Sequence, residues 1–506
     1  MHTPTPEQQA IISAARDCKE SILVRAYAGC AKSTTLEMLA NALPPQPALA
    51  LAFNKKIAVE LEKRFPPHFQ IKTLNGLGHA AWGRALGKRL VLDDKKLGKL
   101  VSEVLKASGF QASQDDWAAV RQLATLAMNQ GLVPRPFTQK GLIADDEDSW
   151  RDLCEQVLGA YDAALAGFAR EVIVANIKQG FQGTISFDDQ IYLSTLFGGQ
   201  YPRFPLVLID EAQDLSPLNH LQLKKCAADR IIAVGDEKQA IYAFRNADSD
   251  SINKIKALRS DWIELPLATT FRCPQVVVEK CKAHAPGFTA FSTNVMGLIH
   301  SLLPKHEDET WNWGRLAPLT NGGTTAVLCR NNAPLLSLAF KLLRSQVGVT
   351  MLGRDIGKGL VLLSKKILKD DELGAAECYA LIHRWAEGEA SLARARDQEE
   401  KIEGIRDREE CLIAVLQGSE AATAGDLRRV LSDLFARDSG RVTLATGHRA
   451  KGLEWDLVVY LDSFRCPSKF ALKKGGKALE QEWNLDYVIC TRTKHTLVYA
   501  NLEDWG

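Results

Sequence analysis

The sequence predicts an α/β protein with two parallel-sheet cores, each interrupted by a mainly helical insertion. Short apolar runs alternate with helical patterns in two separate series, one near the N-terminus and one starting near residue 325. Within each series a stretch of helical pattern separates the strands. The 506 residues fit this plan, because at ~150 residues per domain the length suggests roughly three units rather than one compact core.

The first series begins with an apolar run, a small-residue loop and a helical pattern over 32–43, which is the order of an α/β unit. An amphipathic helix is expected over 54–64. Between about 90 and 180 the pattern is helical, and Trp117, Val120, Leu123 and Leu126 share one helix face. Strands of the first core are expected at 21–26, 47–53, 71–74, 206–209 and 231–234.

The second series continues from an apolar run into a helical pattern over 334–344 and pauses for a charged helical stretch over about 364–438. Its strands are expected at 325–329, 349–352, 442–445 and 457–461. The resulting domain boundaries place the first core at 1–88 and 185–265, its insertion at 89–184, the second core at 266–360 and 441–506, and its short insertion at 361–440.

Composition excludes several classes of protein. With 46% hydrophobic and 25% charged residues the chain is neither a disordered tail nor a fibre. No run approaches the ~20 apolar residues that cross a bilayer, so a cytoplasmic protein without a membrane partner is expected. The eleven cysteines form no CxxC pair, which favours reduced, mostly buried thiols.

The formal net charge of +2 at first disfavours a nucleic-acid partner, since such proteins usually carry a basic surface. A whole-chain sum says nothing about distribution, however. A basic, aromatic-lined channel beside an acidic exterior gives the same total, so a protein that grips and releases a nucleic-acid strand would show a segregated charge pattern, with a continuous positive groove across both cores.

The loop after the first strand carries the residue types that bind a triphosphate. Backbone N–H groups near Gly29, the Lys32 ammonium and the Ser33 hydroxyl can hold phosphate and Mg²⁺. The usual motif has glycine where Ala26 and Ala31 stand, and the methyl group of Ala31 predicts weakened nucleotide affinity; the alternative is a plain small-residue turn. The nucleotide contacts expected here are Ala28, Gly29, Cys30, Ala31, Lys32, Ser33 and Thr34.

An acidic pair follows the apolar strand at 206–209, at the sheet edge where α/β proteins bind ligands. Asp210 is expected to hold Mg²⁺ together with Ser33, and Glu211 to orient and polarise the attacking water. A lone Asp-Glu pair after a strand is usually a solvated loop. Its combination with Lys32 and Ser33 in the correct order is much more specific.

These motifs resemble those of superfamily 1 helicases of the UvrD/Rep/PcrA type, and the resemblance covers both cores in the family's order. It implies two RecA-like cores with the ATP site between them. The segment 5–10 resembles the adenine-reading glutamine motif and implies Gln8, and the segment 234–245 resembles a motif in which Gln239 senses the γ-phosphate and Phe244 stacks on a base. Phe187-Asp188-Asp189 resembles the family's short acidic motif.

In the second core the resemblance implies that Phe271 stacks on adenine, that Arg272 and Arg492 stabilise the transferring phosphoryl group, and that Glu454 contacts the ribose or triphosphate. The catalytic residues implied are Lys32, Asp210, Glu211, Gln239, Arg272 and Arg492. The DNA contacts implied are Phe53, Asn54, Asn75, Tyr242, Phe244, Arg245, His448 and Lys451, with Asn75 standing where histidine is common.

The resemblance implies a motor that uses ATP and Mg²⁺ to move 3′ to 5′ along single-stranded DNA and to open single/double-strand junctions. Two alternatives remain, a non-catalytic DNA-binding scaffold, supported only by Ala31, and the motor subunit of a helicase-nuclease. Segments 54–61 and 352–357 resemble the F-box helicase and phage branch. The residues do not distinguish repair, replication, recombination control and phage defence.

Overall fold

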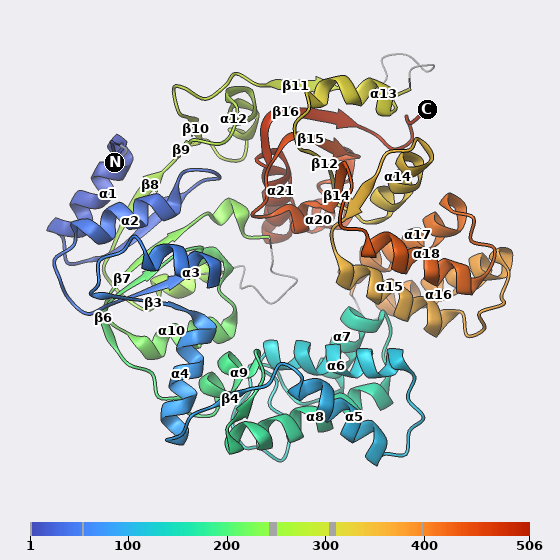
Figure 1. Ribbon diagram of the computed structural model, residues 1–506, viewed down its shortest axis with the longest axis horizontal. Coiled ribbons are helices and arrows are strands. Elements are labelled where there is room, and N and C mark those ends of the chain that lie inside the picture. The colour runs from blue at the N-terminus through green and yellow to red at the C-terminus, as the bar shows by residue number, and fades with distance from the viewer. Residues whose placement is uncertain (1–2, 53–54, 242–249, 303–309, 396–397) are drawn as a thin grey trace. The chain divides into compact units, whose positions relative to one another are not determined.

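The computed structural model describes residues 3–52, 55–241, 250–302, 310–395 and 398–506. The chain divides into two compact units, Met1–Ala268 and Thr269–Gly506. Each unit contains one six-stranded sheet in which every strand pair is parallel (Figure 1). This confirms the predicted α/β class with two parallel-sheet cores.

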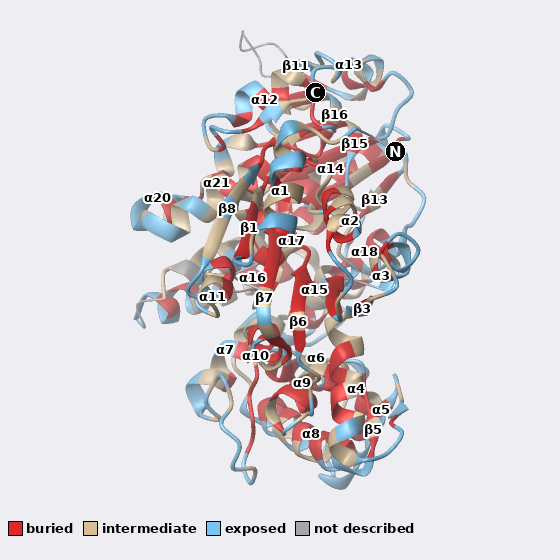
Figure 2. Ribbon diagram, turned by 90° about the vertical axis from the view of Figure 1, so that its left-hand side faces the viewer, coloured by how far each residue is buried: buried red, intermediate tan, exposed pale blue. Residues whose placement is uncertain are grey.

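The first sheet has the strand order β3-β2-β6-β7-β1-β8. Its central strands are almost continuously apolar because both faces are covered, and Figure 2 colours β6 and β7 as buried. The edge strand β8 was not predicted, since its sequence WIELPL is only half-buried and lacks a clear pattern. The strands are β1 (Ser21–Ala26), β2 (Ala48–Ala52), β3 (Phe69–Thr73), β6 (Phe204–Ile209), β7 (Ala227–Gly235) and β8 (Trp262–Leu267).

The helices around this sheet begin with recognisable caps. Thr5 and Gln8 form a reciprocal capping box at the start of α1, whose first residue is Pro6. Ser216 and Asn219 form the same motif at the start of α10. The helices are α1 (Pro6–Asp17), α2 (Lys32–Ala42), α3 (Lys55–Glu62), α4 (Leu74–Leu86), α9 (Asp189–Leu196), α10 (Pro217–Cys226) and α11 (Ser251–Lys256).

The helical insertion of the first unit has a hydrophobic core of its own. Val120 and Leu123 are fully buried in it, while Trp117 and Leu126 pack against it, as the predicted helix face requires. Trp82 of α4 also belongs to this core. The insertion contains α5 (Lys96–Ala107), α6 (Gln114–Asn129), α7 (Glu147–Leu158) and α8 (Ala163–Gln182), with the short strands β4 (Val91–Leu92) and β5 (Thr184–Ile185) pairing in parallel.

The second sheet has the order β11-β16-β15-β12-β14-β13. Four of its strands, β12, β13, β14 and β15, fall where the apolar runs predicted them, whereas the edge strand β11 and the inner strand β16 were not predicted. The strands are β11 (Leu298–Ser301), β12 (Thr325–Cys329), β13 (Val349–Met351), β14 (Val442–Thr446), β15 (Trp455–Leu461) and β16 (Thr493–Ala500). Other elements of this unit are β9 (Thr269–Thr270), β10 (Thr289–Ala290), α12 (Gln275–Cys281), α13 (Trp313–Leu316), α14 (Ala333–Arg344), α19 (Gly447–Ala450), α20 (Lys469–Lys474) and α21 (Gly476–Cys490).

The second insertion shares its hydrophobic core with the second sheet. Ile382 and Leu412 of the insertion lie in the same buried cluster as Val327 and Leu444 of the strands. Arg330, just after β12, pairs with Glu403 of the insertion at 2.9 Å. Its helices are α15 (Arg354–Ile367), α16 (Ala375–Ala395), α17 (Glu400–Gly418) and α18 (Ala424–Ala436), so the boundary expected at 361 falls inside α15.

All eleven cysteines are free thiols, and ten of them are buried. Among the described helices, none is both long and apolar enough to span a membrane.

Candidate functional site

The phosphate loop connects β1 to α2, and its backbone is already shaped for an anion. Gly29 has φ of 70° and Ala31 has φ of 55° and ψ of 43°, a left-handed conformation in both cases. No side chain caps the N-terminus of α2, which starts at Lys32. The first N–H groups of a helix have no partner within the helix, so this end can receive phosphate oxygens.

Four predicted residues meet at this end of the first sheet. The Ser33 hydroxyl donates to Asp210 Oδ2 at 3.2 Å, and Lys32 Nζ lies 3.3 Å from Glu211 Oε1. Asp210 comes 177 residues after Ser33 in the sequence, and Glu211 follows it. The parallel register of the sheet brings them together, because the carboxyl ends of its strands share one edge.

Burial and opposing charges perturb the ionisation of this cluster. Burial, followed by the charge of Glu211, raises the pKa of Asp210 to about 6, although Lys32 opposes the shift. Burial by itself would lower the pKa of Lys32, but Glu211, Asp236 and Asp210 together raise it above its ordinary value. A buried carboxyl group next to a hydroxyl is a donor set that suits Mg²⁺, whose charge would favour ionised Asp210.

A second row of polar side chains supports the first. Gln213 donates from Nε2 to Glu211 Oε2 at 2.7 Å and accepts from the Asp236 N–H at 2.9 Å. The predicted Gln239 donates to Asp236 Oδ2 at 2.6 Å. Gln213 and Asp236 were not identified from the sequence. The available signal was that Asp236 directly follows the apolar strand β7 and that Gln213 lies in the turn after the apolar strand β6.

Gln8 lies beside the phosphate loop. Its amide donates to Thr35 Oγ1 at 3.0 Å, and Thr35 in turn donates to the carbonyl of Ala31 at 3.0 Å. The Gln8 amide oxygen accepts from the Thr5 N–H at 3.0 Å. These bonds couple the start of α1 to the first turn of α2.

The short acidic motif divides into an exposed and a buried part. The Phe187 ring is 59% exposed, and its carbonyl accepts a hydrogen bond from Asn75 Nδ2 at 3.1 Å. Asp189 is fully buried and forms an ion pair with Lys96 at 2.7 Å. Asp189 therefore anchors the helical insertion, whereas Phe187 and Asn75 lie on the surface together.

Five of the implied DNA contacts are outside the described residues, namely Phe53, Asn54, Tyr242, Phe244 and Arg245.

In the second unit Arg272 and Glu454 form an ion pair, with Arg272 Nε 2.6 Å from Glu454 Oε2. Phe271 next to it is 42% exposed, and its ring lies 4.8 Å from that of Phe291. The Thr270 hydroxyl accepts from the Arg272 N–H at 3.2 Å and fixes this turn. The structure thus brings together three of the residues implied for nucleotide binding in this unit, Phe271, Arg272 and Glu454.

Arg492 differs from Arg272 because it is only 1% exposed. Its guanidinium donates to the carbonyls of Val488 at 2.9 Å and Leu453 at 3.2 Å. The neighbouring helix α19 carries His448, and Lys451 follows it; both are half-buried.

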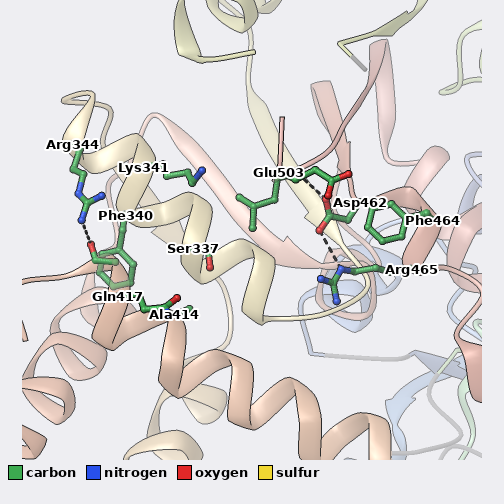
Figure 3. Close-up of a pocket in the computed structure, with 12 residues that line it drawn as sticks. Ser337, Phe340, Lys341, Arg344, Ala414, Gln417, Asp462, Phe464, Arg465 and Glu503 are labelled. Carbon is green, nitrogen blue, oxygen red and sulfur yellow. Dashed lines mark hydrogen bonds and ion pairs between the residues drawn. The ribbon is translucent and has the colours of Figure 1, made fainter. Parts of the chain in front are cut away.

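A cavity of about 410 Å³ lies elsewhere in the second unit (Figure 3). Residues from α14, α17 and the turn after β15 line it, among them Ser337, Lys341, Phe464 and Arg465. Asp462 in its wall is engaged by Arg465 and by the Leu502 N–H. Of the residues predicted for nucleotide or DNA that the structure describes, none lines this cavity.

Comparison with known protein families gives two matches along the chain. The UvrD/REP helicase N-terminal domain matches residues 5–258, and the UvrD-like helicase C-terminal domain matches residues 390–503. The first match contains the phosphate loop and the acidic pair, and the second contains Glu454 and Arg492.

Individual relatives agree with these matches. The F-box DNA helicase protein 1 of Schizosaccharomyces pombe is 24% identical over 98% of this chain and 57% of its own length. A probable DNA helicase II homologue of Rickettsia conorii is 21% identical over 99% of this chain and 93% of its own. The chain spans about half the length of the F-box DNA helicases that it matches. The two domain matches and the resemblance read from the motifs agree: the chain belongs to the UvrD/Rep helicases of superfamily 1A.

Proposed function

We propose that this protein is an ATP-dependent translocase and helicase that moves 3′ to 5′ on single-stranded DNA. The observation that carries the proposal is the convergence of Lys32, Ser33, Asp210 and Glu211 at one sheet edge, with the hydrogen bond and ion pair between them. A lysine for the phosphates, a hydroxyl and carboxyl for a metal ion, and a carboxylate for water are the groups that phosphoryl transfer to water needs.

Each group has a distinct task in this proposal. Backbone N–H groups from Gly29 to Ser33 receive the β-phosphate, and Lys32 leaves Glu211 to contact the β- and γ-phosphates. Ser33 and Asp210 would hold Mg²⁺, which neutralises charge on the phosphate oxygens. Glu211 then orients the attacking water. Positioning and charge stabilisation of this kind supply most of the catalysis in phosphoryl transfer.

The second unit supplies cations and an aromatic platform. We assign adenine stacking to the exposed Phe271 ring and transition-state stabilisation to Arg272 and Arg492. Arg272 exchanges its present partner Glu454 for phosphate oxygens, so Glu454 is released toward the ribose. Arginine residues in this role accelerate hydrolysis by about 10³ to 10⁵ in related phosphoryl-transfer enzymes.

The strand is assigned to surfaces of both units. Asn75, beside exposed Phe187, and the half-buried His448 and Lys451 contact the DNA, together with Phe53, Asn54, Tyr242, Phe244 and Arg245. The resemblance to the UvrD/Rep family supports the proposed 3′ to 5′ direction of movement.

The test is the variant Lys32→Ala, which removes the phosphate-binding ammonium. We expect it to abolish DNA-stimulated ATP hydrolysis and to leave single-strand binding intact, because Lys32 faces carboxylates rather than a DNA surface. Lys63→Ala, at an exposed lysine of the same unit, is the control and should hydrolyse ATP normally. Robust hydrolysis by Lys32→Ala refutes the assignment.

A second candidate function is a DNA-binding scaffold without turnover, and the methyl group of Ala31, at a position where the usual phosphate loop has glycine, favours it. ATP hydrolysis measured with and without single-stranded DNA separates the two candidates. Strand displacement on 3′-tailed, 5′-tailed and forked DNA, with RNA controls, then tests direction and substrate. Unwinding that requires a 5′ tail refutes the proposed polarity.

A further candidate is the motor subunit of a helicase-nuclease. The RecBCD enzyme subunit RecB of Mycolicibacterium smegmatis is 26% identical over 42% of this chain, which supports this possibility for part of the chain only. This candidate would be favoured over the independent motor if the protein co-purifies with a nuclease and hydrolyses ATP only in the presence of that nuclease.

A further inference from the structure

A buried amide links the two loops that carry the proposed hydrolytic groups. Gln213 lies in a short 3₁₀ turn (Ala212–Asp214) after β6 and is 1% exposed. One end of its side chain donates to Glu211 Oε2 at 2.7 Å. The other end accepts from the N–H of Asp236, after β7, at 2.9 Å. Both ends of the amide are therefore committed to groups of the nucleotide site.

The surroundings leave this amide little freedom. A Cβ atom at Gly235 would lie 2.9 Å from Gln213 Oε1 and 3.3 Å from the Ala212 side chain, so only glycine permits the two loops to approach this closely. On the other side, the Ser251 hydroxyl of α11 donates to the Ala212 carbonyl at 2.6 Å. Contacts on two sides thus hold the turn that carries Gln213.

The residue that Gln213 contacts has an unusual backbone. Glu211 has φ of 49° and ψ of 45°, a left-handed conformation that is costly for a residue with a side chain. Strain of this kind persists where the surrounding structure over-determines it. One Glu211 oxygen is bound to Gln213, and the other lies 3.3 Å from Lys32.

We propose that Gln213 is the positioning residue for Glu211 in ATP hydrolysis, and that it makes Glu211 and Gln239 act as one unit. The inference rests on the proposed function. When Lys32 turns to the phosphates, Glu211 Oε1 is released for the attacking water, while Gln213 keeps Oε2 in place. Gln213 also accepts from the Asp236 backbone N–H, and Gln239 donates to the Asp236 carboxylate at 2.6 Å. A γ-phosphate contact at Gln239 therefore also fixes the Glu211 carboxylate, through Asp236 and Gln213.

Gln213→Met tests this, because methionine has a similar shape and makes neither hydrogen bond. We expect kcat for DNA-stimulated ATP hydrolysis to fall by about 10- to 100-fold, the effect of misplacing a catalytic group by about 1 Å. KM for ATP should stay within about twofold, since Gln213 makes no direct hydrogen bond to a residue assigned to the phosphates. A purely structural defect would lower the active fraction and would leave kcat per active site unchanged.

The matched control is Gln222→Met. Gln222 is equally buried, at 0% exposed, and donates to the Leu74 carbonyl at 2.8 Å, outside the nucleotide site. The kcat per active site of Gln222→Met should equal that of the unmodified chain. Active sites are counted by binding of a fluorescent ATP analogue. Equal kcat values for Gln213→Met and Gln222→Met overturn the proposal.

Gln213→Glu covers the case in which Gln213→Met does not fold. The carboxylate keeps an acceptor for the Asp236 N–H but replaces the donor that faces Glu211, so kcat should still fall while the fold is retained. Normal kcat in Gln213→Glu overturns the proposal. If the unmodified chain shows no DNA-stimulated hydrolysis, the proposed function itself fails; if the unmodified chain is active, the variants decide the role of Gln213 alone.

Discussion

Replacing Asp189 by asparagine should destabilise the helical insertion of the first unit severely. The carboxylate accepts hydrogen bonds from Lys96 Nζ at 2.7 Å and from the Ser186 N–H at 2.7 Å, and it also contacts Asn176. Neither side chain of the Lys96–Asp189 pair is exposed to solvent. The substitution leaves the ammonium buried with the Asn176 carbonyl, at 2.9 Å, as its other hydrogen-bond acceptor.

The size of the effect follows from the burial of the pair. Removing one partner of a buried ion pair costs about 3–5 kcal/mol, because the remaining charge has lost its compensation. Domains are typically stable by about 5–15 kcal/mol, so the loss is about a fifth of the total or more. In a unit of this size each kcal/mol lowers the melting temperature by roughly 2–4 °C, which predicts a decrease of about 6–20 °C.

Asp188→Asn is the matched control, and we expect it to stabilise the fold where Asp189→Asn destabilises it. Burial, and then the charge of Asp189, raises the pKa of Asp188 from its ordinary value to about 6. The folded state therefore binds more protons at this group, and its contribution destabilises the fold increasingly as pH rises from about 4 to about 6. At pH 7.5 the substitution should stabilise by about 1–3 kcal/mol, since one pKa unit corresponds to about 1.4 kcal/mol, and at pH 4 the gain should vanish.

Urea denaturation followed by circular dichroism measures the free energy of unfolding of both variants. Amide hydrogen exchange in α5 and α8 then shows whether the loss of stability lies in the insertion. The double variant Lys96→Met with Asp189→Leu should recover most of the stability, because a buried ion pair can be replaced by apolar residues of similar volume. If Asp189→Asn unfolds at the same urea concentration as the unmodified chain, the buried pair is not the anchor inferred here.

Two further variants test the nucleotide and DNA sites. Ala31→Gly removes a methyl group where the loop approaches phosphate. It should lower KM for ATP by about three- to tenfold, equivalent to about 0.7–1.4 kcal/mol. Stability should change by less than about 1 kcal/mol, because relief of the left-handed strain is offset by the greater flexibility of glycine in the unfolded chain; an unchanged KM would contradict this. Phe187→Ala should weaken single-strand binding by about 1–3 kcal/mol without lowering the melting temperature, since the ring is 59% exposed. Tyr379→Ala, at an exposed aromatic of α16, should bind normally, and equal affinities of the two variants would rule out a stacking role for Phe187.

The strands that were predicted from the sequence include every central strand of the first sheet and three of the four central strands of the second. β1 and β12 coincide with their apolar runs, because a central parallel strand has no solvent-facing side. The edge strands β3 and β13 were also predicted, whereas β8, β11 and β16 were missed because polar or exposed residues make up part of each. Such a strand has no clear hydrophobic periodicity in its sequence, and its position is set by pairing with a neighbouring strand.

Burial and charge also explain which residues of the site could be predicted from the sequence. Lys32 and Asp210 carry charges in a recognised spacing, and the rule that parallel strands end at one edge brings them together. Gln213 is an uncharged amide whose importance comes from its burial and from its two partners, neither of which is visible in sequence. The left-handed backbone of Ala31 is equally hidden, since alanine is an ordinary residue in a helix or loop.

The helical insertions show a further limit of sequence patterns. Both were predicted from helical periodicity, yet the first has its own core and the second is part of the core of its sheet. Periodicity reports that a helix has an apolar face and does not report what covers that face. In the second insertion α17 packs against α14 and α18 packs against β13, and the Arg330 pair with Glu403 joins the insertion to the end of β12.

Backbone strain gives a reason to prefer turnover over a passive scaffold. Among the described residues that are not glycine, five have positive φ, and two of them, Ala31 and Glu211, belong to the nucleotide site. Each costs roughly 1–2 kcal/mol. Local bonds hold both, from Thr35 to the Ala31 carbonyl and from Gln213 to the Glu211 carboxylate. In a scaffold this strain would lower stability without benefit. In an ATPase it places the phosphate-binding loop and the water-orienting carboxylate in advance, so that less of the nucleotide's binding energy is needed to assemble the site.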